Sequence, residues 1–90
     1  MAASTYHVIL KRDAAKALQT IPNLIAQQAQ GFINTHLQHH PTQRIPSKLK
    51  QLKGSLAGIW QYDLPSGYRL WYRVDPDVQV VSVIYIGPHP

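Results

Sequence analysis

The sequence GYRLWYRV at residues 67–74 decides how this chain is interpreted. Side chains alternate between the two faces of a strand, so Arg69, Trp71 and Arg73 are expected on one face. The alternate set is predicted to face the core: Tyr68, Leu70, Tyr72 and Val74. Two guanidinium groups beside an indole suit phosphates and unstacked bases. A solvated strand face would show the same pattern, so this stretch alone leaves both interpretations open.

Working outward from this stretch, turn and helix signals predict the neighbouring elements. Pro65-Ser66-Gly67 lies between two strand-like runs and predicts a hairpin, and Asp75-Pro76-Asp77 turns the chain again. After Pro22, apolar residues recur at spacings of three and four residues. This spacing predicts an amphipathic helix, and Pro41 is expected to end it. The other expected elements are a strand over residues 6–11, a helix from residue 14 capped by Asp13, a loop over 39–50, and strands over 59–64, 68–74 and 78–86.

The final strand and the order of elements set the fold class. Residues 78–86 are β-branched and almost continuously apolar, which predicts a central strand buried on both faces that Gly87-Pro88 ends. The order is β-α-α-β-β-β, with helices and strands segregated, so the predicted class is α+β. Neither a repeat nor a domain boundary is visible, and residues 1–90 are expected to form a single domain.

Charge and composition narrow the functional classes. Nine Lys and Arg residues stand against four Asp and no Glu, giving a net charge of +5, which favours nucleic acid, a membrane surface or an acidic protein as partner. The absence of cysteine excludes a disulfide scaffold, a thiolate zinc site and a cysteine nucleophile. No apolar run approaches the roughly 20 residues that span a bilayer, and the N-terminus lacks signal-peptide features. We therefore expect a cytoplasmic protein without membrane association.

Three segments, in this order and spacing, resemble the RelE/ParE superfamily of bacterial toxins. They are KLKQLKG at residues 48–54, SGYRLWY at 66–72 and VIYIG at 83–87, and the likeness is closest to the RelE-like branch. The resemblance covers nearly the whole chain. It implies a small, mainly antiparallel sheet packed against two N-terminal helices. It also implies a cognate acidic antitoxin bound across the sheet in a toxin–antitoxin hetero-oligomer.

The same resemblance implies one of two activities. RelE-like members cut mRNA in the ribosomal A site, whereas ParE-like members share the fold but inhibit DNA gyrase and lack the nuclease residues. We expect the toxin of a type II toxin–antitoxin module, acting as a ribosome-dependent mRNA endoribonuclease without metal or other cofactor. The alternatives are a ParE-like gyrase inhibitor and a degenerate member that only binds its antitoxin. Fold alone does not decide between them.

Two residues are the candidates for catalysis. Cleavage by the RNA 2′-hydroxyl requires proton removal, proton donation and stabilisation of the charged phosphorus centre. Arg69 stands where RelE-like nucleases carry their phosphate-binding arginine, although ParE-like members share the Gly-Tyr-Arg pattern. His89 follows Gly87-Pro88, where several RNA-cleaving branches carry a histidine, and an imidazole is a common proton carrier. The alternative for His89 is a frayed chain end.

Further residues are candidates for contacts with RNA. They are Lys48, Lys50, Lys53, Arg73 and Trp60. Each cation is otherwise an ordinary solvated charge, and a tryptophan in so small a domain more often belongs to the core. The pair His39-His40 lacks carboxylate or cysteine partners, so no metal site is expected.

The chain also departs from the RelE pattern. Trp60 and Tyr62 stand where RelE carries two strand lysines, which leaves the general base unassigned. Asp63 is the only acid near this hairpin, and its parity places it on the face opposite Trp60 and Tyr62. Tyr85 shares strand parity with His89, although a core tyrosine is the alternative interpretation.

Overall fold

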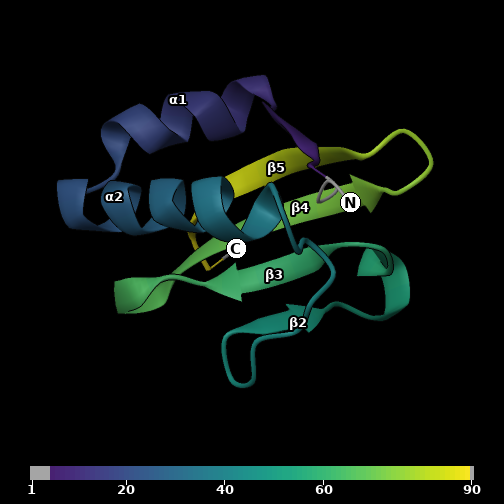
Figure 1. Cartoon of the computed structure of the whole chain (residues 1–90). Coiled ribbons are helices and arrows are strands. Elements are labelled where there is room, and N and C mark those ends of the chain that lie inside the picture. The colour runs from purple at the N-terminus through teal and green to yellow at the C-terminus, as the bar shows by residue number, and fades with distance from the viewer. Residues whose placement is uncertain (1–4, 90) are drawn as a thin grey trace.

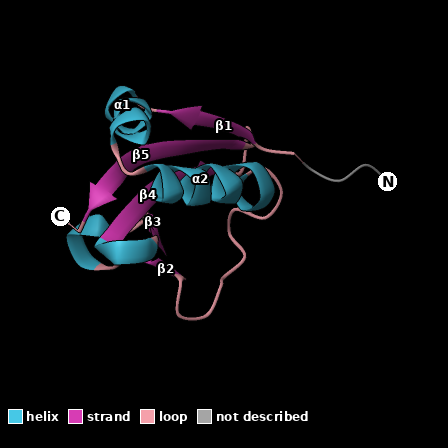
Figure 2. Cartoon of the chain, turned by 90° about the vertical axis from the view of Figure 1, so that its left-hand side faces the viewer, coloured by secondary structure: helices cyan, strands magenta, loops and turns pink. Residues whose placement is uncertain are grey.

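The computed structural model describes residues 5–89 and shows a single sheet with helices packed against it (Figure 1). The strands are β1 (His7–Leu10), β2 (Leu49–Gln51), β3 (Trp60–Asp63), β4 (Tyr68–Asp75) and β5 (Val80–Pro88). The helices are α1 (Arg12–Thr20) and α2 (Asn23–Phe32), and α2 continues into a π-helical turn at Ile33–Leu37. The long loop from this turn to β2 extends away from α2 (Figure 2).

The strands follow the order β1-β5-β4-β3-β2 across the sheet. β1 runs parallel to β5, and every other neighbouring pair is antiparallel. The predicted α+β class and the mainly antiparallel sheet are therefore confirmed. No helix within residues 5–89 has the length and apolar character needed to cross a membrane.

The core lies between the helices and one face of the sheet. Leu70 and Tyr72 of β4 are fully buried, as the alternation in that strand predicts. Val81 and Val83 of β5 are fully buried as well. They belong to one apolar cluster that includes buried residues of α1, α2 and the π-helical turn. Burial of this apolar surface is the main contribution to stability in so small a domain.

Two expectations about the N-terminal half were wrong. α1 begins at Arg12 rather than at residue 14, and Asp13 does not cap it but lies in its first turn, where a carboxylate favours the helix dipole. The segment expected as a loop over 39–50 ends in β2, whose Leu49 is buried and pairs with Tyr62 of β3. In β2 a single apolar residue is followed by Lys50 and Gln51, so apolar and polar residues do not alternate long enough to indicate a strand.

The last strand also differs from its prediction. β5 continues through Gly87 to Pro88, which is aligned with Tyr68, so Gly87-Pro88 does not end the strand. β5 lies inside the sheet between β1 and β4, but it is not buried on both faces, because Ser82, Ile84 and Tyr85 remain partly exposed. A bulge leaves Ile84 without a partner, because Trp71 is aligned with Tyr85 and Tyr72 with Val83.

Candidate functional site

The sheet face turned away from the helices carries the polar side chains of the central strands. Cross-strand partners share a face, and the register aligns Lys50 with Gln61, Gln61 with Trp71, Asp63 with Arg69, and Trp71 with Tyr85. We call this surface the open face and define it by seven side chains. They are Lys50, Gln61, Asp63, Arg69, Trp71, Arg73 and Tyr85.

Arg69 is the half-buried cation of the open face. Only 20% of its side chain is exposed, and its Nε lies 3.3 Å from Oδ1 of Asp63. Its Nη1 donates a hydrogen bond of 3.2 Å to the carbonyl oxygen of Tyr68. The Nε atom is buried but makes no well-aligned hydrogen bond within the described chain. The guanidinium is therefore held in place, and its Nε faces a carboxylate.

A chain of side-chain hydrogen bonds orients that carboxylate. Trp71 Nε1 donates to Gln61 Oε1 at 2.9 Å, and Gln61 Nε2 donates to Asp63 Oδ1 at 3.1 Å. Gln61 is only 7% exposed, so both ends of its amide have partners inside the structure. The order of contacts is Trp71, Gln61, Asp63 and Arg69, and each residue limits the freedom of the next.

His89 extends the open face beyond the end of β5. Its backbone N–H donates to the carbonyl oxygen of Gly67 at 3.0 Å, and Gly87 is aligned with Arg69. His89 therefore shares strand parity with Gly87 and lies about 7 Å farther along the strand. The backbone thus brings His89 to the end of the sheet at which Arg69 lies.

Tyr85 lies across Gly87 on this surface. Its hydroxyl donates to the carbonyl oxygen of Pro88. A Cβ at Gly87 would approach this hydroxyl to 2.8 Å, so the position favours glycine. The Tyr85 ring is tilted against the Trp71 indole, with 5.5 Å between ring centroids, and both rings are partly exposed. They offer an aromatic surface beside Arg69.

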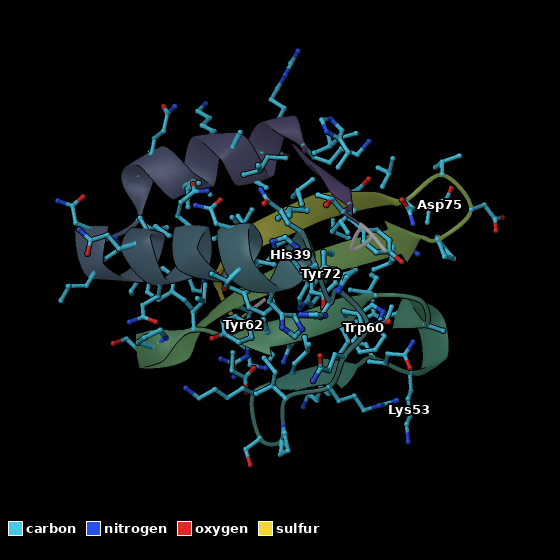
Figure 3. The ribbon with its side chains drawn as sticks, in the orientation of Figure 1. His39, Lys53, Trp60, Tyr62, Tyr72 and Asp75 are labelled. Carbon is cyan, nitrogen blue, oxygen red and sulfur yellow. The ribbon has the colours of Figure 1, made fainter. Side chains whose placement is uncertain are left out.

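The predicted basic contacts are spread over the open face and the neighbouring edge of the sheet rather than gathered around Arg69. Lys48, Lys50 and Lys53 are exposed on or beside β2, and Lys53 extends outward from the edge of the molecule (Figure 3). A cleft of about 160 Å³ lies between Lys48, Lys50 and Asp63. Arg73 is exposed next to Gly58 at the other end of β4.

Trp60 and Tyr62 are not part of this surface. Both face the helices: Trp60 is 6% exposed and stacks on Tyr72, and Tyr62 stacks on Phe32 with 3.7 Å between centroids (Figure 3). The β3 residues that share the face of Arg69 are Gln61 and Asp63, and neither is basic. The predicted opposition of Asp63 to Trp60 and Tyr62 is confirmed.

Sequence reasoning did not assign a role to Asp63 or Gln61. A signal was present, because Asp63 and Arg69 each lie three residues from Ser66 at the centre of the turn, and a symmetric hairpin aligns such residues. The parity of Asp63 within its own strand gives its face but not its cross-strand partner. The contact with Arg69 depends on the cross-strand register.

A second polar group lies on the helix side of the sheet. His36 stacks on Phe32 at 5.0 Å, and a groove of about 420 Å³ runs beside them between α2 and β3. Burial lowers the pKa of His36; its 2.9 Å contact with the Gln43 carbonyl raises the pKa, and His40 lowers it further. This histidine is separated from Arg69 by the sheet. Within residues 5–89, no three His or Asp side chains are grouped to hold a metal ion.

Comparison with known proteins gives a consistent result. The family model described as the ParE toxin of type II toxin–antitoxin system, parDE, matches residues 8–89. No curated protein sequence matches the chain. Similar solved structures include the RelBE2 toxin–antitoxin complex of Mycobacterium tuberculosis, with 25% identity, a TM-score of 0.76, and coverage of 94% of this chain and 99% of that one.

Two further structures share the fold. The YoeB/ParE toxin of Agrobacterium tumefaciens has 20% identity and a TM-score of 0.79, covering 93% of this chain and 99% of that one. The intact RelBE toxin–antitoxin complex of E. coli has 23% identity and a TM-score of 0.73, covering 94% of this chain and 98% of that one. At these identities the likeness establishes the architecture alone.

Proposed function

The chain belongs to the ParE toxin family of type II toxin–antitoxin systems, and we propose that it acts in such a pair by cutting mRNA on the ribosome. The observation that supports this activity is the proximity of the two backbones: Gly87 is the cross-strand partner of Arg69, and His89 lies two residues beyond it, hydrogen-bonded to Gly67. A phosphate-binding arginine and an imidazole are two of the groups that metal-free RNA cleavage requires.

Each group has a chemical role in this proposal. The 2′-hydroxyl of the substrate attacks its own 3′-phosphate, and the 5′-oxygen of the next nucleotide leaves. Arg69 stabilises the charge that develops on the phosphate oxygens, since guanidinium presents a rigid set of donors. His89 transfers a proton to or from one of the two reacting oxygens. Trp71 and Tyr85 offer rings on which an unstacked base can lie.

Inhibition of DNA gyrase is the second candidate, and a specific observation favours it. The matching family model is that of ParE toxins, and the open-face residues of β3 are Gln61 and Asp63. A nuclease site would gain from cations at those positions, because they would stabilise the phosphate charge. A gyrase inhibitor would need no such cations.

Controlled expression separates the two candidates. The wild-type chain is induced in a bacterial host, and host transcripts are mapped for new 5′ ends while plasmid supercoiling is followed. Cleavage within translated codons before any change in supercoiling supports the nuclease. Intact transcripts with relaxed plasmid or a DNA-damage response support gyrase inhibition. An Arg69→Ala variant is induced in parallel and should lose the effect. Arg12→Ala is its matched control, because it removes the same charge from an exposed residue of α1.

A further inference from the structure

We propose that Asp63 sets the phosphate affinity of Arg69, because its carboxylate is a resident anion at Nε that competes with an incoming phosphate. This inference rests on the proposed function only in taking Arg69 as the phosphate-binding group. It assigns to Asp63 a role opposite to that of a catalytic base. Asp63 weakens the site, and its removal strengthens binding.

The geometry of the guanidinium is the first argument. A phosphate approaches arginine best through two parallel N–H donors. In this structure Nε is buried and faces Asp63 Oδ1 at 3.3 Å, while Nη1 already donates to the Tyr68 carbonyl oxygen. A bidentate approach that uses Nε therefore requires the carboxylate to move.

The orientation of the carboxylate is the second argument. Asp63 Oδ1 accepts from Gln61 Nε2, and Gln61 is fixed in turn by Trp71. Because Gln61 is almost fully buried, this arrangement is built into the sheet rather than adopted by a free surface side chain. The Asp63 side chain is itself 37% exposed, so water and a competing anion reach it from outside.

Electrostatics gives the expected size of the effect. A carboxylate about 5 Å from a bound phosphate weakens binding about 4-fold in water and more where water is displaced. Asp63→Asn keeps the shape of the side chain and removes the charge. We expect it to tighten phosphate binding at Arg69 by about 5- to 50-fold. Asp77→Asn, in the exposed turn before β5, is the matched control for the change in net charge.

The primary experiment follows the Arg69 Nε–H resonance by NMR during titration with inorganic phosphate. In the Asp63→Asn protein this resonance is expected to shift at phosphate concentrations 5- to 50-fold lower than in the wild type or in Asp77→Asn. Asp63→Glu restores the charge and should bring the affinity back toward the wild type. Equal phosphate affinity in Asp63→Asn and Asp77→Asn would overturn the inference.

A second measurement uses fluorescence anisotropy with a 2′-O-methyl single-stranded RNA, which cannot be cleaved by its 2′-hydroxyl. Asp63→Asn is expected to bind this probe more tightly than Asp77→Asn, and the gain should disappear in an Arg69→Ala background. A gain that persists without Arg69 would mean a general charge effect and would also overturn the inference. If Asp63→Asn fails to fold, as checked by thermal melting, Asp63→Ser provides the same test.

Neither measurement depends on cleavage, so the two proposals can fail separately. If phosphate affinity rises in Asp63→Asn while no variant cuts mRNA, the role of Asp63 stands and the nuclease proposal falls. If the wild type cuts mRNA and Asp63→Asn shows no gain in affinity, the nuclease proposal stands and the role of Asp63 falls.

Discussion

At the scale of single residues, Arg69 is the side chain on which the proposed chemistry depends most. Arg69→Ala is expected to reduce mRNA cleavage about 10²- to 10³-fold, the usual effect of losing one preorganised donor to a developing charge. Arg69→Lys should recover little, since an ammonium group cannot form the bidentate contact. Growth after induction and 5′-end mapping measure both effects. Undiminished toxicity in well-expressed Arg69→Ala protein would exclude this role.

His89 is exposed, and its backbone N–H donates to the Gly67 carbonyl oxygen. If it carries a proton, His89→Ala should slow cleavage about 10²- to 10⁴-fold. His89→Gln should perform no better, because an amide cannot exchange the proton. Single-turnover cleavage of a ribosome-bound message measures this rate. A variant that cleaves at the wild-type rate would make the histidine a bystander.

His36 gives the folded state a dependence on pH. Its pKa in the folded protein lies below the ordinary value of 6.5, so the unfolded chain binds protons that the folded chain excludes. The stabilisation is fully present above pH 6.5 and is lost as pH falls through the lowered pKa. His36→Gln keeps an N–H donor for the Gln43 carbonyl without titrating.

We therefore expect His36→Gln to lose less stability than the wild type between pH 7.5 and pH 5. Thermal unfolding at a series of pH values measures the difference. His39→Gln, at an exposed position outside this stack, is the control and should keep the wild-type slope. If stability falls equally with pH in the wild type and in His36→Gln, His36 is not the source of the pH dependence.

At the scale of elements, one buried hydrogen bond joins β4 to the loop after the π-helical turn. The Tyr72 hydroxyl donates to the Pro41 carbonyl oxygen at 2.6 Å, and burial raises the pKa of this tyrosine. Tyr72→Phe leaves the carbonyl oxygen unpaired and should cost about 1–3 kcal/mol of unfolding free energy. Urea unfolding measures the loss. Tyr68→Phe removes the same atom from a ring at a less buried position and should cost less.

The elements differ in how well sequence alone predicts them. β4 was predicted correctly because its buried and exposed side chains alternate from Tyr68 to Asp75. β2 was missed because its only buried residue is Leu49, and its pairing with β3 supplies what its own sequence lacks. Arg69 could be selected from its local motif. Its contact with Asp63 requires the alignment of two strands, for which the symmetry of the hairpin about Ser66 is the one sequence signal.

At the scale of the whole molecule, the net positive charge indicates the kind of partner that the chain attracts. The structural relatives include toxin–antitoxin complexes, and a net charge of +5 makes an acidic antitoxin the expected partner. Association with that antitoxin should slow as salt concentration rises, because screening weakens long-range attraction. Stopped-flow measurement at several salt concentrations tests this expectation. An association rate constant that does not change with salt would contradict it.

The parallel pairing of β1 with β5 bears on when this toxin becomes dangerous to the cell that makes it. His7 is aligned with Val80, so within residues 5–89 the first strand has no neighbour in the sheet until β5 has been synthesised. The strand that carries Gly87 and leads into His89 lies inside the sheet between β1 and β4. The proposed site therefore cannot assemble before β5 has been synthesised. The delay before this non-local pairing forms gives an antitoxin time to reach the toxin as it folds.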